Sequence, residues 1–209
     1  NSILNDISRI EDPLLASRFR LLIMIDAAKA VQDISETGVI HRDIKSDNIV
    51  LEVHPERGFE GLKILDFGLA RLVGPEDALL NQPLNLAAFE ERESLEEAIR
   101  EAGTIYTATG TVNGTIPYIA PELSTLHETR PQDLRQPASD IFSLGVLFYQ
   151  TVTGGRIPGD PYGGNNAFDV LEAHAKGNFQ QPVFYEEDMD PELNEFIVWI
   201  TSVGFGGHG

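Results

Sequence analysis

The chain has 209 residues, a net charge of −18 and no cysteine. Its length suits one domain, or one domain with an appendage, and a hydrophobic content of 42% excludes a disordered acidic chain. The absence of cysteine excludes disulfides, thiolate metal sites and thiol nucleophiles. The acidic balance disfavours nucleic acid and anionic membranes, and the longest uncharged apolar run, 141–153, is too short to span a bilayer. We expect a soluble cytoplasmic domain, with any anchor of the parent chain outside this segment.

The first part of the chain predicts one long helix and a β-hairpin. Asp12-Pro13 is a typical helix start, and apolar residues recur at three-and-four spacing up to Gly38. Two β-branched runs follow at 49–53 and 62–65, and the turn-rich stretch 54–58 lies between them.

The remainder predicts an acidic insertion and a helical core. Residues 75–103 carry eight acidic side chains against two arginines, which indicates a solvated helical insertion. Residues 138–153 are apolar almost all round, so we expect a buried helix at the centre of the core. Weaker helical spacing covers 168–175, a further helix begins at Asp190-Pro191, and the glycine-rich tail 204–209 is expected to fray.

Four motifs follow one another along these elements. The first, between the long helix and the first strand, is His41-Arg42-Asp43-Ile44-Lys45-Ser46-Asp47-Asn48, and Asp66-Phe67-Gly68 closes the second strand. With segments 114–122 and 139–145, they resemble the H-R-D-x-K-x-x-N catalytic loop, the D-F-G turn, the A-P-E loop and the central helix of eukaryotic-type Ser/Thr protein kinases. The resemblance covers 13–200 and implies a mainly α fold with a small β-hairpin, the α+β C-terminal lobe of a protein kinase.

The resemblance implies a role for each polar residue of the first two motifs. Asp43 would orient the acceptor hydroxyl and take its proton, and Lys45 would contact the transferring phosphate and indicates Ser/Thr specificity. Asn48 and Asp66 would offer Mg²⁺ oxygen ligands from two sides of the hairpin. Val50 would form part of the apolar floor under the adenine of ATP.

Three further residues are expected to support the catalytic loop. By the same resemblance, Asp140 would anchor the backbone of the loop from the central helix. His41 and Phe67 would be packed core members that link the loop to the D-F-G turn.

Arg42 makes the chain similar to kinases that are switched on by phosphorylation. A guanidinium beside the catalytic carboxylate can pair with a phosphate on the activation segment. Thr111 is the first candidate for that phosphate, and Thr109 is a second threonine of the segment. Thr115 is expected to contact the catalytic loop, and Glu122 closes the substrate-binding loop.

Other parts of a kinase domain have no counterpart in this sequence. None of its four lysines lies in a V-A-x-K context before the catalytic loop, and no glycine-rich loop precedes the long helix. No arginine follows Arg156 to pair with Glu122 from a late helix. We therefore expect a partial kinase domain at 1–203, a C-terminal lobe without the N-terminal lobe, with its catalytic loop at 41–48 and its activation segment at 66–122. Alone it should show little or no activity.

The motifs favour Mg²⁺-dependent transfer of the ATP γ-phosphoryl group to Ser/Thr hydroxyls of a protein substrate. One alternative is a pseudokinase or scaffold that uses the lobe for binding, against which the intact motif residues argue. Another is a small-molecule phosphotransferase, which shares a similar loop but is disfavoured by segment 114–122, because this segment resembles a platform for peptides. The reading frame upstream of Asn1 would distinguish the active kinase from the pseudokinase or scaffold.

Overall fold

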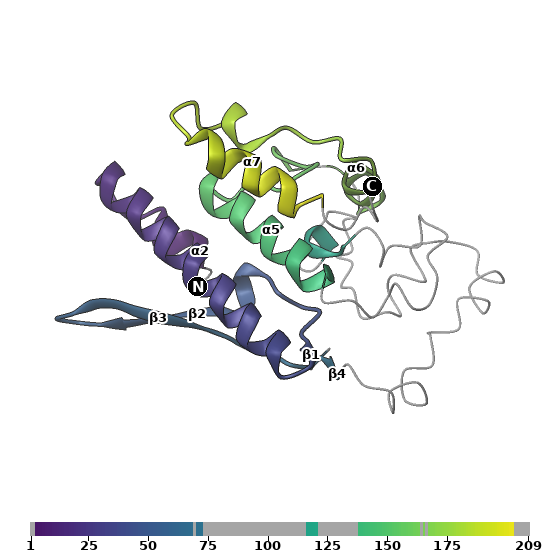
Figure 1. The fold of residues 1–209 in the computed structure, drawn as a ribbon. Helices are drawn as coiled ribbons and strands as arrows, with labels where there is room; N and C mark the ends of the chain where they lie inside the picture. Colours follow the sequence, from purple (N-terminus) through teal and green to yellow (C-terminus); the bar gives the residue numbers. More distant parts are fainter. Residues whose placement is uncertain are drawn as a thin grey trace.

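The computed structural model describes residues 3–68, 70–72, 116–120, 138–163, 165 and 167–202. The expected mainly helical fold with a small antiparallel sheet is present in this part of the chain (Figure 1). The expected insertion at 75–103 and the tail at 204–209 lie outside the described residues. The described helices and strands are α1 (Ile3–Ile7), α2 (Pro13–Glu36), β1 (Val39–Ile40), β2 (Ile49–His54), β3 (Gly58–Ile64), β4 (Arg71–Leu72), α5 (Ala138–Val152), α6 (Ala167–Lys176) and α7 (Pro191–Ile200). Short 3₁₀ turns are η1 (Ser46–Asn48), η3 (Ile116–Tyr118) and η6 (Pro182–Phe184).

Helix α2 begins and ends where the sequence predicts. The Asp12 carboxylate accepts the backbone N–H groups of Leu14 and Leu15 at 2.9 and 3.1 Å, which satisfies two amides that a helix start leaves free. At the other end Thr37 caps the helix and Gly38 takes a left-handed φ of 77°.

Strand β3 begins at Gly58, earlier than the expected start at residue 62. The β2–β3 register shifts between Glu52 and Val53, and this irregularity breaks the alternation of apolar and polar residues that marks a strand in the sequence. Phe59 then packs edge-on against Phe19 of α2, with ring centroids 5.4 Å apart. The hairpin is consequently longer than predicted, and its strand β3 packs against α2 while the tip of the hairpin projects away from the helix (Figure 1).

Helix α5 forms the centre of the core, as predicted. All of its residues except Ala138 and Ile141 are buried, and it packs against α2, α7 and η3. At Gly145, a Cβ atom would lie 2.9 Å from Cγ2 of Ile200 and 3.1 Å from its carbonyl carbon. Glycine at this position therefore permits the close approach of α7 to α5 that Figure 1 shows.

Two short pairings were not evident in the sequence. Val39 pairs with Leu72, and Ile40 with Arg71, so β1 and β4 form an antiparallel ladder of two residues each. Elements this short carry no periodicity that a sequence could reveal. Their pairing matters because it returns the chain, soon after the D-F-G turn, to the point where the catalytic-loop motif begins.

The core also contains a histidine that the sequence leaves without a role. His174 is fully buried, and its Nε2 lies 2.9 Å from the carbonyl oxygen of Pro158. Burial lowers the pKa of His174 to about 4, so the ring is neutral near pH 7.

Among the residues that the structure describes, no group of three or more His, Asp or Glu side chains is placed to hold a metal ion. No helix in the described ranges is long and apolar enough to cross a membrane.

Candidate active site

The backbone of loop 41–48 is held by a buried aspartate on another element. Asp140 lies in the first turn of α5, and its two carboxylate oxygens accept the amides of His41 and Arg42, each at 2.7 Å. Burial raises the pKa of Asp140, while the hydrogen bonds from the two backbone amides lower it in part. The expected anchor is therefore present, and it joins residues almost one hundred positions apart.

Two non-glycine residues in the described part of the chain have left-handed backbones, and both belong to the site. Arg42 has a φ of 67° and Asp66 a φ of 65°. Such conformations cost on the order of 1 kcal/mol or more and persist only where surrounding contacts impose them. For Arg42 the imposing contact includes the hydrogen bond from its own amide to Asp140.

Asp43, Lys45 and Asn48 form one hydrogen-bonded cluster. The Nζ of Lys45 donates to both carboxylate oxygens of Asp43, at 3.0 and 2.8 Å. The Nδ2 of Asn48 donates to Oδ2 and to the backbone carbonyl of Asp43, both at 2.8 Å. Asp43 and Asn48 are buried, and the side chain of Lys45 is only 17% exposed. The cluster is a pre-arranged carboxylate with a cation and an amide beside it.

The hairpin ties the residue before Asp66 to this cluster. The amide of Leu65 donates to the carbonyl oxygen of Asn48 at 2.7 Å, so the residue before Asp66 is fixed to the end of loop 41–48. His41 makes a second link, because its Nε2 donates to the carbonyl of Leu65 at 3.1 Å while its Nδ1 accepts the amide of Asp43 at 3.3 Å. The Asp66 carboxylate is exposed and accepts the Gly68 amide at 3.1 Å.

The sequence profile of the protein kinase domain matches residues 4–204. The chain belongs to the protein kinase family. It is 29% identical over 202 residues to a probable serine/threonine-protein kinase, CE0033, of Corynebacterium efficiens. The matched region covers 96% of this chain and 24% of that relative. The chain is 30% identical over 197 residues to serine/threonine-protein kinase PknA of Mycobacterium tuberculosis, covering 94% of this chain and 34% of the relative. With PknB of Mycolicibacterium smegmatis the identity is 27% over 195 residues, covering 93% and 24%. The chain thus spans about a quarter to a third of the length of these curated relatives.

Two apolar residues of the kinase motifs lie at the surface of the site. Val50, on β2, is 45% exposed. Phe67 was expected in the core, and this expectation is wrong in part: its ring meets that of His41 with centroids 4.6 Å apart, but 51% of the residue is exposed. His41 is fully buried, as expected. Phe67 therefore packs against His41 of loop 41–48 while about half of the residue stays exposed.

The remaining predicted residues divide into two groups. Arg42 is half-buried beside Asp43. Thr109, Thr111, Thr115 and Glu122 lie outside the described residues. The sequence reasoning gave no role to Tyr118 or Gln150, although both are buried and make hydrogen bonds next to the catalytic loop. The signal was available for Tyr118, because it lies inside the motif 114–122.

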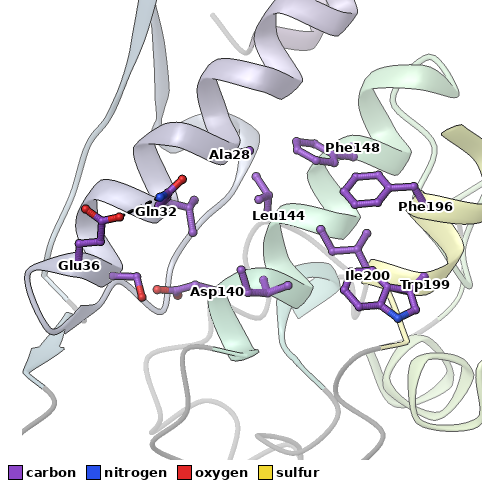
Figure 2. A pocket seen from close by; sticks show the side chains of 12 residues that line it. Ala28, Gln32, Glu36, Asp140, Leu144, Phe148, Phe196, Trp199 and Ile200 are labelled. Atoms are coloured by element: carbon purple, nitrogen blue, oxygen red, sulfur yellow. Dashed lines mark hydrogen bonds between the residues drawn. The ribbon is translucent and has the colours of Figure 1, made fainter.

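A cavity of about 520 Å³ lies between α2, α5 and α7. Figure 2 shows mainly apolar side chains around it, with Gln32, Glu36 and Asp140 at one side. None of Asp43, Lys45, Asn48 or Asp66 lines this cavity. It is lined by Ala28, Val31, Gln32, Ser35, Glu36, Asp140, Ile141, Leu144, Phe148, Phe196, Trp199 and Ile200.

Proposed function

We propose that the protein containing this chain is a Ser/Thr protein kinase, which transfers the γ-phosphoryl group of ATP to Ser/Thr hydroxyls of protein substrates. The observation that carries the proposal is the cluster of Asp43, Lys45 and Asn48, together with the Leu65–Asn48 hydrogen bond that brings Asp66 beside it. The names of the relatives agree with this activity.

In this proposal Asp43 orients the acceptor hydroxyl and takes its proton as the new oxygen–phosphorus bond forms. Phosphoryl transfer needs mainly positioning and charge stabilisation from the protein. The hydrogen bond from Asn48 and the ion pair with Lys45 hold the Asp43 carboxylate in one orientation before substrate arrives. In the proposal, the ammonium group of Lys45 pairs with the Asp43 carboxylate and also contacts the phosphate that is transferred next to it.

Asn48 and Asp66 fit the requirements of a magnesium site. Asn48 uses its amide nitrogen on Asp43, which leaves its amide oxygen as the donor atom for a cation. Asp66 offers a carboxylate that is exposed and engages one amide of its own turn. Mg²⁺ prefers oxygen ligands and keeps waters and phosphate oxygens in its shell, so two protein ligands suffice. When bound, Mg²⁺ would neutralise phosphate charge, and the exposed Val50 would contact the adenine of ATP.

We further propose that residues 1–203 form the C-terminal lobe of the domain, with the catalytic loop at 41–48 and the activation segment at 66–122, and that this chain alone has little activity. Nucleotide would then be covered on one side only. Lys29, Lys63 and Lys176 lie at the surface of the described residues and pair with Asp26, Glu52 and Glu172.

The function is tested by assaying the full-length protein and the 209-residue chain in parallel. We expect the full-length protein to transfer label from γ-labelled ATP to Ser/Thr of a basic protein substrate in Mg²⁺, and to lose this activity in EDTA. The 209-residue chain should transfer little or no label. Nucleotide or partner binding without transfer would contradict the proposal and favour a pseudokinase or scaffold. Transfer only to small molecules would contradict it as well and favour a small-molecule phosphotransferase.

Regulation by phosphorylation is a second part of this proposal. We expect phosphate on Thr111, with Thr109 as the neighbouring candidate, to pair with Arg42 and raise activity. Arg42 is suited to this role because its backbone is fixed beside Asp43 by Asp140. Mass spectrometry of the active full-length protein should find the phosphate, and Thr111→Ala should lower its rate, with Thr104→Ala as the control. A normal rate and unchanged phosphate content in Thr111→Ala would contradict the assignment.

A further inference from the structure

Tyr118 connects three separate parts of the chain through one buried hydroxyl. The residue lies in η3, is 5% exposed, and accepts a hydrogen bond from the amide of Ser46 at 3.2 Å. Its hydroxyl lies 3.2 Å from the Ser46 hydroxyl and donates to Oε1 of Gln150 on α5. The phenol therefore has partners on the catalytic loop and on the central helix at once.

Helix α5 fixes both ends of Tyr118. The hydroxyl of Ser143 donates to the backbone carbonyl of Tyr118 at 2.8 Å, and the side chain of Gln150 accepts from its phenol. Residues seven positions apart lie on the same face of a helix, two turns from each other. Because α5 is buried and holds Tyr118 at both its carbonyl and its hydroxyl, the core helps to direct that hydroxyl at Ser46.

The loop end of this connection lies next to the proposed catalytic residues. Ser46 directly follows Lys45 and opens η1, whose closing bond runs from the amide of Asn48 to the carbonyl of Lys45 at 3.0 Å. Fixing the amide of Ser46 therefore fixes the turn that carries both Lys45 and Asn48. These two residues in turn hold the Asp43 carboxylate.

We propose that Tyr118 and Gln150 are positioning residues of the kinase reaction, which hold the turn 45–48 in the geometry that directs Lys45 and Asn48 at Asp43. This inference rests on the proposed function and adds two residues to it. The two do not touch substrate or nucleotide in the proposal; they act through Ser46. Asp140 anchors the beginning of the loop, and the Tyr118–Gln150 pair anchors its end. Helix α5 therefore contributes a residue to each anchor.

The neutral pairing explains why an amide suits position 150. Burial raises the pKa of Tyr118, so its hydroxyl keeps its proton and can donate to Gln150 while accepting from Ser46. An amide oxygen accepts this proton without adding a buried charge beside the phenol. Loss of either group would leave the buried amide of Ser46 or the phenol without its fixed partner.

The test compares variants of the full-length protein in steady-state kinetics. We expect Tyr118→Phe and Gln150→Leu to lower kcat by about tenfold, with KM values for ATP and protein substrate changed by less than about threefold. Tyr149→Phe is the matched control, because Tyr149 is a neighbouring, 1% exposed tyrosine of α5 whose hydroxyl donates to the carbonyl of Gln180 at 2.9 Å, away from the loop.

Hydrogen exchange at the Ser46 amide gives a readout that does not depend on activity. We expect exchange to accelerate about tenfold or more in Tyr118→Phe and to stay unchanged in Tyr149→Phe. Equal losses of kcat in these two variants, or unchanged exchange at Ser46 in Tyr118→Phe, would each overturn the proposal. An inactive wild-type protein would instead count against the kinase function, while faster Ser46 exchange in Tyr118→Phe alone would still support the positioning role.

Discussion

Replacing Asp43 with asparagine is expected to lower kcat of the full-length protein by about 10²- to 10⁴-fold. The carboxylate is the only group of the cluster that can take a proton from an acceptor hydroxyl, because Lys45 and Asn48 use N–H donors on it. Asparagine has nearly the same shape but no basic oxygen. It would also remove one partner of the Lys45 ion pair, whose two distances are 3.0 and 2.8 Å.

The matched control for this substitution is Asp47→Asn. Asp47 lies in the same turn, four residues away, but is exposed and has no role in the proposed chemistry. We expect kcat and the melting temperature of Asp47→Asn to stay near wild type. Phosphotransfer should be measured with each variant at matched concentration, after circular dichroism has shown equal folding. An Asp43→Asn protein that retains more than about a tenth of wild-type kcat would rule out Asp43 as the proton acceptor.

Substituting Asp140 with alanine is expected to affect stability and catalysis together. The change leaves the amides of His41 and Arg42 buried without their acceptor, at about 1 to 3 kcal/mol each. The raised pKa of Asp140 shows that burying its charge is itself unfavourable, and alanine removes this penalty. We therefore expect a net loss of about 2 to 4 kcal/mol in the free energy of unfolding. This is less than the full cost of two unpaired amides, because removing the buried charge offsets part of it.

Catalysis should fall because the anchor imposes the left-handed backbone of Arg42. Without Asp140 the φ of 67° is no longer held, and residues 41–43 can relax toward ordinary conformations. We expect kcat to decrease by at least about tenfold. Urea unfolding and steady-state kinetics measure the two effects.

Asp160→Ala is the control for the Asp140 substitution. Asp160 is also buried, at 7% exposure, and its carboxylate accepts the amide of Asn165 at 3.2 Å, far along the chain from the catalytic loop. It should lose stability without a specific loss of kcat. Equal kcat in Asp140→Ala and wild type would show that the loop keeps its geometry without this anchor.

Much of the fold is local enough to be predicted. Helix α2 follows from the Asp12 cap, the proline after it and the apolar spacing up to Gly38, and helix α5 follows from its nearly continuous apolar run. Strand β3 was placed too late because the register shift at Glu52 depends on the partner strand. The ladder of β1 with β4 was missed because each strand has two residues and is stabilised only by the other.

The candidate site shows the same division. The motifs identify Asp43, Lys45, Asn48 and Asp66 because phosphoryl transfer requires a carboxylate, a cation and oxygen ligands at set spacings. Tyr118 lies inside the motif 114–122, but its role, like that of Gln150, depends on hydrogen-bond partners that only the fold brings together.

The sequence by itself determined the family and the types of side chain at the site, because these depend on residues that are close together in the chain. The resemblance already pointed to Asp140 as an anchor, but only the tertiary structure gave its two hydrogen bonds to a loop almost one hundred residues away and the link from Tyr118 to Ser46, 72 residues apart. Hydrogen bonds over such separations follow from how α5 packs against α2 and η3, and no local pattern records them.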